Sequence, residues 1–200
     1  MNNILLDPLP HEWNGYQVNT SFRIGIQAFL VRDDKELADW EKTNVILFLL
    51  FEDDDGNLRE HPVGTDLESC INWFLNGWYH DRQSGGRQEK RLIDYDIDQY
   101  RIFADFMQIY AINLNTADMH FWEFMGLLWN MPYKYSSFLQ VIEIRKKAIT
   151  GKMGSEEKKM IREAKNVYEL EQPGQEYSQE EKDKIDAYDR MMARMKHKEQ

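Results

Sequence analysis

The spacing of apolar residues changes once along the chain, near residue 20, and this change separates two kinds of predicted structure. Before it, two early prolines exclude a helix, and Asn14-Gly15 lies between Trp13 and Tyr16, as is typical of a type I′ hairpin. After it, apolar residues recur every three or four positions, the period of an amphipathic helix. The pattern therefore predicts a mainly α fold: a compact multi-helix domain with a short N-terminal β-hairpin.

Each predicted helix carries its own apolar stripe. The stripes comprise Phe22, Ile26, Phe29 and Leu30; Leu37, Trp40, Leu47, Phe48 and Phe51; Leu67, Cys70, Ile71, Phe74 and Trp78; Tyr100, Phe103, Met107 and Tyr110; Phe138, Val141, Ile142 and Ile149; and Met160, Ile161, Ala164, Val167 and Tyr168. Residues 119–131 are apolar on nearly every side, so this segment is expected to be buried or covered by a partner. Arg145-Lys146-Lys147 is expected to lie on the outside of its helix.

Three segments are expected along the chain. Residues 1–20 form an N-terminal segment with the hairpin, residues 21–170 form the helical core domain, and residues 171–200 form a linker and a terminal amphipathic helix. The linker is indicated by Pro173-Gly174, and Ser178 with Glu181 is a capping box. Three alternatives remain open for the terminal helix: it docks on the core, it pairs with a partner, or it is disordered. The polar, glycine-rich residues 83–90 are expected to form a mobile loop.

Composition excludes several classes of protein. A single cysteine cannot form an intramolecular disulfide framework or an all-cysteine metal site. The net charge of -10 has the wrong sign for coating nucleic acid. No apolar run is long enough to span a membrane, and no secretory signal is recognisable, which indicates a cytoplasmic protein.

No catalytic or metal-binding motif is evident, so we expect no enzyme, no cofactor and no metal. Consecutive aspartates at 53–55 fit a solvated turn better than a calcium loop. Asp94, Asp96 and Asp98 alternate before a strong helix, where we expect capping; a metal enzyme that uses them with His120 is a weaker hypothesis. His120 is expected to be a hydrogen-bonded structural residue, and Cys70 a small buried one.

The surplus of aromatic residues and the methionine-rich terminal helix indicate a surface for association. Most tryptophans are expected in the core, with the remainder at an interface. The candidate partner-binding residues are Trp122, Trp129, Tyr188, Met191, Met192 and Met195.

Several motifs together resemble the bacteriophage "Gp-fifteen" family of siphophages from Gram-positive hosts. They are Asp7-Pro8-Leu9-Pro10, the run from Val18 to Arg23, Trp73-Phe74 leading to Gly77-Trp78-Tyr79, the Ser84-Gly85-Gly86 loop, Asp94 to Asp98, Phe103 to Leu114, His120 to Met125, and Tyr168-Glu169-Leu170. The resemblance covers about residues 4 to 170. The chain departs from the family at residues 110–114, where Tyr-Ala-Ile-Asn-Leu replaces the usual Tyr-Gly-Ile-Asp-Leu, so no functional carboxylate is expected there.

The resemblance implies a tail-assembly chaperone encoded between the major tail protein and the tape measure protein. Such a protein would self-associate and bind the tape measure protein in the host cytoplasm, keeping it soluble until tail-tube polymerisation. The expected partners are therefore the tape measure protein, the major tail protein and other copies of the chain, with no nucleic acid and no membrane. The alternative is a structural tail or baseplate component that is retained in the virion.

Overall fold

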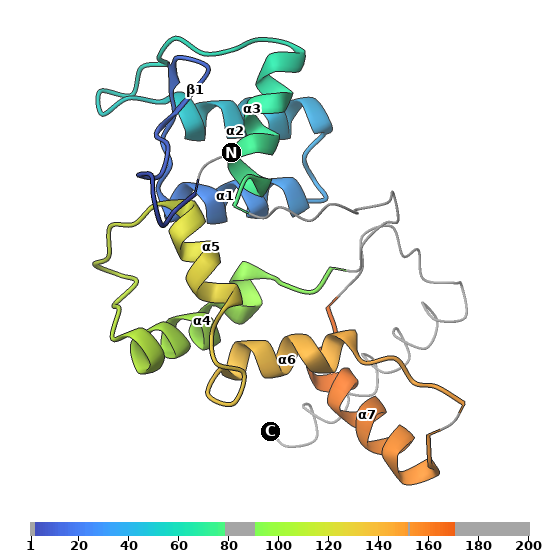
Figure 1. The fold of residues 1–200 in the computed structure, drawn as a ribbon. Coiled ribbons are helices and arrows are strands. Elements are labelled where there is room, and N and C mark those ends of the chain that lie inside the picture. The colour runs from blue at the N-terminus through green and yellow to red at the C-terminus, as the bar shows by residue number, and fades with distance from the viewer. Residues whose placement is uncertain (1–2, 79–90, 152, 171–200) are drawn as a thin grey trace, which may run out of the picture. The chain divides into compact units, whose positions relative to one another are not determined.

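The described part of the protein is a short hairpin followed by helices, as the sequence predicts (Figure 1). It comprises residues 3–78, 91–151 and 153–170 of a computed structural model. The elements in these ranges are β1 (Glu12–Trp13), β2 (Tyr16–Gln17), α1 (Phe22–Asp33), α2 (Asp39–Phe51), α3 (Thr65–Asn76), α4 (Tyr95–Tyr110), α5 (Phe121–Trp129), α6 (Ser137–Lys146) and α7 (Ser155–Tyr168). The prediction of a mainly α protein with an N-terminal hairpin is confirmed.

The hairpin is built around Asn14 and Gly15, which have φ angles of 49° and 88°. Positive φ at both central positions is what a type I′ turn requires. The turn pairs Glu12 with Gln17 and Trp13 with Tyr16 in antiparallel register. The sequence therefore identified this turn correctly.

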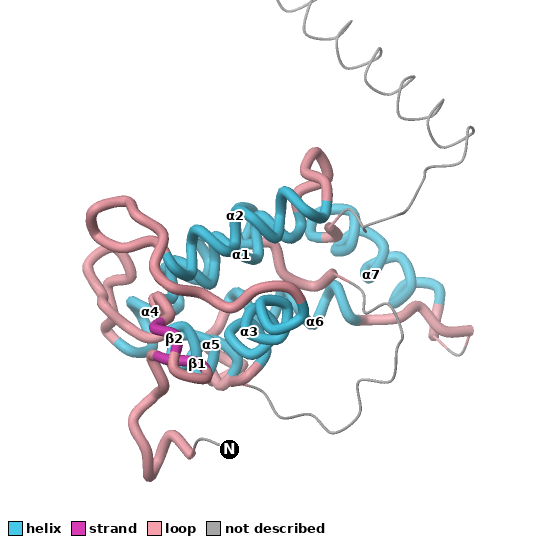
Figure 2. The backbone as a smooth tube through the Cα atoms, turned by 90° about the horizontal axis from the view of Figure 1, so that it is seen from above, coloured by secondary structure: helices cyan, strands magenta, loops and turns pink. Residues whose placement is uncertain are grey.

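Helix α5 lies between two groups of helices (Figure 1). On one side, α1 and α2 run side by side, as Figures 1 and 2 both show, with α3 packed on α2. On the other side, α4 packs on α6, and α6 packs on α7. The side chains of Phe121, Phe124 and Leu128 on α5 are fully buried, so this helix forms the centre of the core.

Close packing at α5 depends on two contacts with the first group of helices. A Cβ atom on Gly25 of α1 would overlap the ring of Phe121, so only glycine lets these helices approach so closely. The indole Nε1–H of Trp122 donates to the backbone oxygen of Phe74 at 2.8 Å, which joins α5 to α3.

Several predicted core positions are exposed instead. Helical spacing places each of them on the apolar stripe of its own helix, but within the described residues no neighbouring helix covers these positions. The exposed residues are Trp40 (67%) and Phe48 (50%) on α2, Tyr100 (80%) and Met107 (43%) on α4, Met160 (68%) and Val167 (72%) on α7, and Ile149 (39%) beyond the end of α6. Their assignment to a buried face was wrong.

Some predictions fall on residues that the structure does not describe. The loop at residues 83–90 and the linker and terminal helix at residues 171–200 lie outside the described ranges. The predicted domain boundaries therefore stay predictions. Within the described ranges, none of the helices is both long and apolar enough to cross a bilayer.

Candidate functional site

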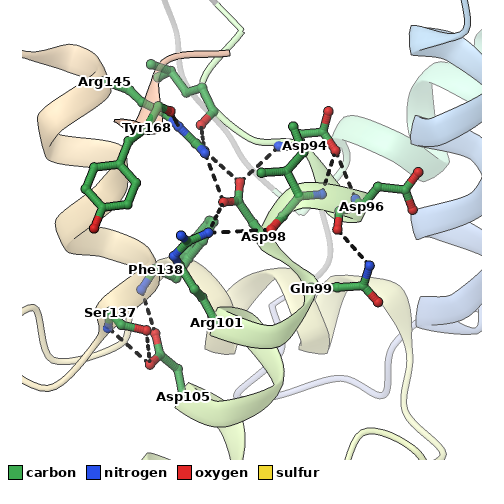
Figure 3. A network of polar contacts seen from close by, with 12 residues as sticks. Asp94, Asp96, Asp98, Gln99, Arg101, Asp105, Ser137, Phe138, Arg145 and Tyr168 are labelled. Carbon is green, nitrogen blue, oxygen red and sulfur yellow. Dashed lines mark hydrogen bonds and ion pairs between the residues drawn. The ribbon is translucent and has the colours of Figure 1, made fainter. Parts of the chain in front are cut away.

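Helix α4 has a polar face, and the carboxylates on this face connect it to α6 (Figure 3). Asp98 on this face is completely buried and pairs with Arg145 of α6, with Nη1 2.6 Å from Oδ2 and Nη2 3.0 Å from Oδ1. Arg101, on the next turn of α4, lies 3.3 Å from the same carboxylate. A bidentate arginine–carboxylate pair fixes both the separation and the orientation of the two helices.

Arg145 makes two further contacts that connect distant segments. Its Nε donates to the backbone oxygen of Tyr168 at 2.7 Å, and its Nη1 donates to that of Leu92 at 2.8 Å. The side chain is only 1% exposed, so the prediction that it lies outside was wrong. The missed signal was helical spacing, because Arg145 follows Phe138 by seven residues and Ile142 by three on the buried stripe.

Asp105 forms the second connection between α4 and α6. Its carboxylate accepts from the backbone N–H of Ser137 and Phe138, at 3.1 and 2.9 Å, and from the hydroxyls of Ser136 and Ser137, at 2.7 and 2.9 Å. These backbone donors lie at the start of α6, where a helix has free N–H groups and favours negative charge. With Asp98 at the other end of α6, α4 is held at two points.

The opposite face of α4 lines a groove of about 580 Å³, and α1 forms the other wall. We call this the α1–α4 groove. Its half-buried apolar side chains are Ile26 and Leu30 from α1, Phe103 from α4, and Leu114 from the segment that follows α4. Four buried side chains lie deeper: Phe22, Tyr95, Ile102 and Phe124. The rest of the lining is Arg23, Asp96, Gln99, Tyr100 and Asn115. The walls are therefore mainly apolar, with polar groups at the edges.

Charge is distributed unevenly around this groove. A smaller hollow adjoins it and shares Leu30 and Asp96 with it; this hollow is also lined by Asp33, Asp34 and Asp94. Arg91 contacts Asp33 at 3.1 Å and Asp94 at 2.8 Å. Asp34 and Asp96 are exposed and form no ion pair within the described residues. We call this region the acidic end of the groove.

The two acidic clusters singled out in the sequence have structural roles. Asp94 caps α4 by accepting from the backbone N–H of Asp96 and Ile97, which confirms the capping prediction. Asp53 accepts from the backbone N–H of Asp55 and Asn57, so its carboxylate stabilises the predicted turn. Within the described ranges, no three His, Cys, Asp or Glu side chains are placed to hold a metal ion.

His120 is a structural residue, as predicted, and it is the N-cap of α5. Its Nδ1 accepts from the backbone N–H of Trp122 at 3.0 Å, while Nε2 contacts the backbone oxygen of Pro10 at 2.9 Å. This arrangement needs the neutral ring with its proton on Nε2. Burial lowers the pKa of His120, which favours the same neutral form, and the nearby His11 ring acts in the same direction.

The predicted partner-binding residues lie in different environments from one another. Trp122 is only 7% exposed and belongs to the core, so it offers little surface to a partner. Trp129 is half-buried, packs edge-on against Phe138, and has an indole N–H without an acceptor in the described structure. Tyr188, Met191, Met192 and Met195 lie outside the described residues. The sequence did not single out the α1–α4 groove, whose walls come from segments about 70 residues apart.

Residues 5–170 match the family model described as "Bacteriophage Gp15 protein". No curated protein and no solved structure matches the chain significantly.

Proposed function

Because the chain belongs to the bacteriophage Gp15 protein family, we propose that it is a phage tail-assembly chaperone. In this proposal it binds the tape measure protein and keeps it soluble until tail-tube polymerisation, when the major tail protein displaces it. It acts in the host cytoplasm, and its chemistry is association without catalysis.

The observation that carries the proposal is the α1–α4 groove with its apolar walls. A groove of this kind suits an amphipathic helix, which binds by laying its apolar face between two supporting helices. Tyr100 stands at the edge with 80% of its surface exposed, and aromatic residues of this kind are frequent in interface hot spots. The site therefore favours a protein ligand with apolar side chains.

A second exposed apolar surface supports self-association. Trp40, Val45 and Phe48 lie on the outside of α2 and are 67%, 39% and 50% exposed. Large exposed side chains grouped on one helix are a usual feature of protein–protein contacts. We assign this surface to contacts between copies of the chain, which sedimentation equilibrium would test: a Trp40→Ser variant should shift the distribution towards monomers.

The charge of the protein fits the same role. A net charge of -10 makes a complex with an apolar partner repel other complexes, which limits aggregation. A chaperone that covers apolar segments benefits from such a charge, because like-charged complexes stay apart in solution.

Co-expression with the tape measure protein of the same phage tests the proposal. The tape measure protein should be more soluble than when it is expressed alone, and the two proteins should co-purify. If neither happens, the proposal is wrong. Mass spectrometry of purified virions distinguishes this proposal from the alternative. A chaperone should be absent from the particles, whereas a structural tail or baseplate component should be present.

A further inference from the structure

The α1–α4 groove has a direction, because its two walls run antiparallel. Phe29, near the end of α1, lies 5.7 Å from Tyr95 at the start of α4, measured between ring centroids. At the other end, Phe22 and Phe106 both stack on Phe124, with centroids 5.2 Å apart in each pair. From Phe22 to Asp33, α1 extends for about 16 Å, which matches about three turns of a bound helix.

The two ends of the groove carry opposite charges. Arg23 lies at one end, where its guanidinium donates to the backbone oxygens of Ala117, Leu114 and Asn115 at 2.8 to 3.1 Å. The acidic end lies at the other, with the exposed carboxylates of Asp34 and Asp96. A ligand that fills the apolar middle of the groove is therefore bound best if it has a positively charged group at the acidic end and a negatively charged group near Arg23.

We propose that the α1–α4 groove binds an amphipathic helix of a partner protein, with a lysine or arginine placed at the acidic end. Apolar residues at positions i, i+3 or i+4, and i+7 of this helix pack against Ile26, Leu30 and Phe103. This inference rests on the proposed function, since it assigns the groove to the tape measure protein, and it specifies the chemistry of the bound segment.

A second copy of this chain suits the groove less well. Each copy has a net charge of -10, so pairing at an acidic surface brings together two chains that repel each other. A segment with basic residues gains from the same surface, because its charge is opposite to that of the two exposed carboxylates. The charge of the acidic end thus favours a different protein as the occupant.

Two pairs of matched variants test the groove. Tyr100→Ser removes the exposed ring at the groove edge, and Tyr133→Ser removes a 56% exposed ring elsewhere. Asp96→Lys reverses a charge at the acidic end, and Asp66→Lys makes the same change at the second residue of α3, which corresponds to the place of Asp96 in α4. All four side chains are exposed, so the variants should fold.

Affinity for the co-expressed tape measure protein is the first measurement. Tyr100→Ser and Asp96→Lys should each weaken binding about tenfold, whereas the two controls should bind like the wild type. If the wild type binds and the groove variants bind equally well, this inference is wrong and the proposed function stands. If the wild type itself does not bind, the proposed function is wrong, and this inference with it.

Crosslinking identifies the occupant directly. The photoreactive residue p-benzoylphenylalanine replaces Tyr100 in the full chain, with the same replacement at Tyr133 as a control, and the crosslinked peptide is sequenced. We expect a tape measure segment with apolar residues at helical spacing and a lysine or arginine at one end. A crosslink to a second copy of the chain, or to a segment without this pattern, would overturn the inference.

Discussion

Arg145 and Asp98 form a bidentate ion pair inside the protein, with side chains that are 1% and 0% exposed and a shortest N–O distance of 2.6 Å. The pair joins α6 to α4, and α4 in turn supplies one wall of the groove. Removing either partner would leave a charge buried without its main counterion. The position of the groove wall thus depends on an interaction on the opposite face of the same helix.

The first prediction concerns this pair. Arg145→Ala should lower the free energy of unfolding by about 3–5 kcal/mol, because Asp98 stays buried and the backbone oxygens of Tyr168 and Leu92 lose a donor. Urea unfolding measures the change. Arg101→Ala is the control: it removes a 33% exposed arginine from the same carboxylate and should cost at most about 1 kcal/mol. Equal losses in the two variants would contradict the assignment of Arg145 as the main counterion.

The second prediction compares two glycines in helices. Gly25→Ala should destabilise the protein by about 1–3 kcal/mol, because the added methyl group overlaps the ring of Phe121 and forces α1 and α5 apart. Gly126→Ala should stabilise it by about 0.5–1 kcal/mol, because no atom lies near the new methyl group and alanine favours the helix. Thermal unfolding of both variants checks this, and a gain in stability for Gly25→Ala would show that the helices are not so closely packed.

The third prediction concerns pH and His120. Burial lowers the pKa of this ring below its ordinary value of 6.5, so the unfolded chain binds its proton more readily than the folded one. The stability that His120 provides is therefore complete above pH 6.5 and declines as the pH falls from there towards the lowered pKa, by at most about 1.4 kcal/mol per pH unit.

His120→Asn isolates this contribution, because asparagine can still cap the helix and does not titrate. Urea unfolding at about pH 7.5 and about pH 5.5 should show a smaller loss of stability in the variant than in the wild type. All other titratable groups are the same in the two proteins, so the difference between them reports His120. Identical pH dependence in the two proteins would mean that His120 does not contribute.

The fourth prediction concerns the thiol of Cys70. This side chain is fully buried, and burial raises its pKa to about 12, so very little reactive thiolate is present at neutral pH. A thiol reagent such as dithionitrobenzoate should modify only a small fraction of the Cys70 thiol in the folded protein within minutes. In urea it should react with one, since the chain has a single cysteine. Rapid reaction of the folded protein would instead indicate opening around α3.

Local features were predictable from the sequence because they depend on neighbouring residues. The turn at Asn14-Gly15, the cap at Asp94, the turn at Asp53 and the buried position of Cys70 follow from backbone preference, capping chemistry and helical spacing. The family, too, was identified from motifs in linear order, and the match over residues 5–170 confirms it.

The faces of the helices were predictable only in part. Spacing correctly placed Phe138 and Ile142 of α6 in the core, but it also placed Tyr100 and Met107 of α4 there, and these are exposed. A helical stripe shows that residues share a face, whereas burial also requires a neighbouring helix along the whole of that face. The sequence alone carries no such information for α4.

The helices, the hairpin, the acidic charge and the family of this protein follow from its residues read in order. The burial of Arg145, the place of Trp122 in the core, and the groove between α1 and α4 depend on how the helices pack. These features arise where segments distant in the sequence meet, and an arginine is stable inside the protein only if a carboxylate such as Asp98 meets it there.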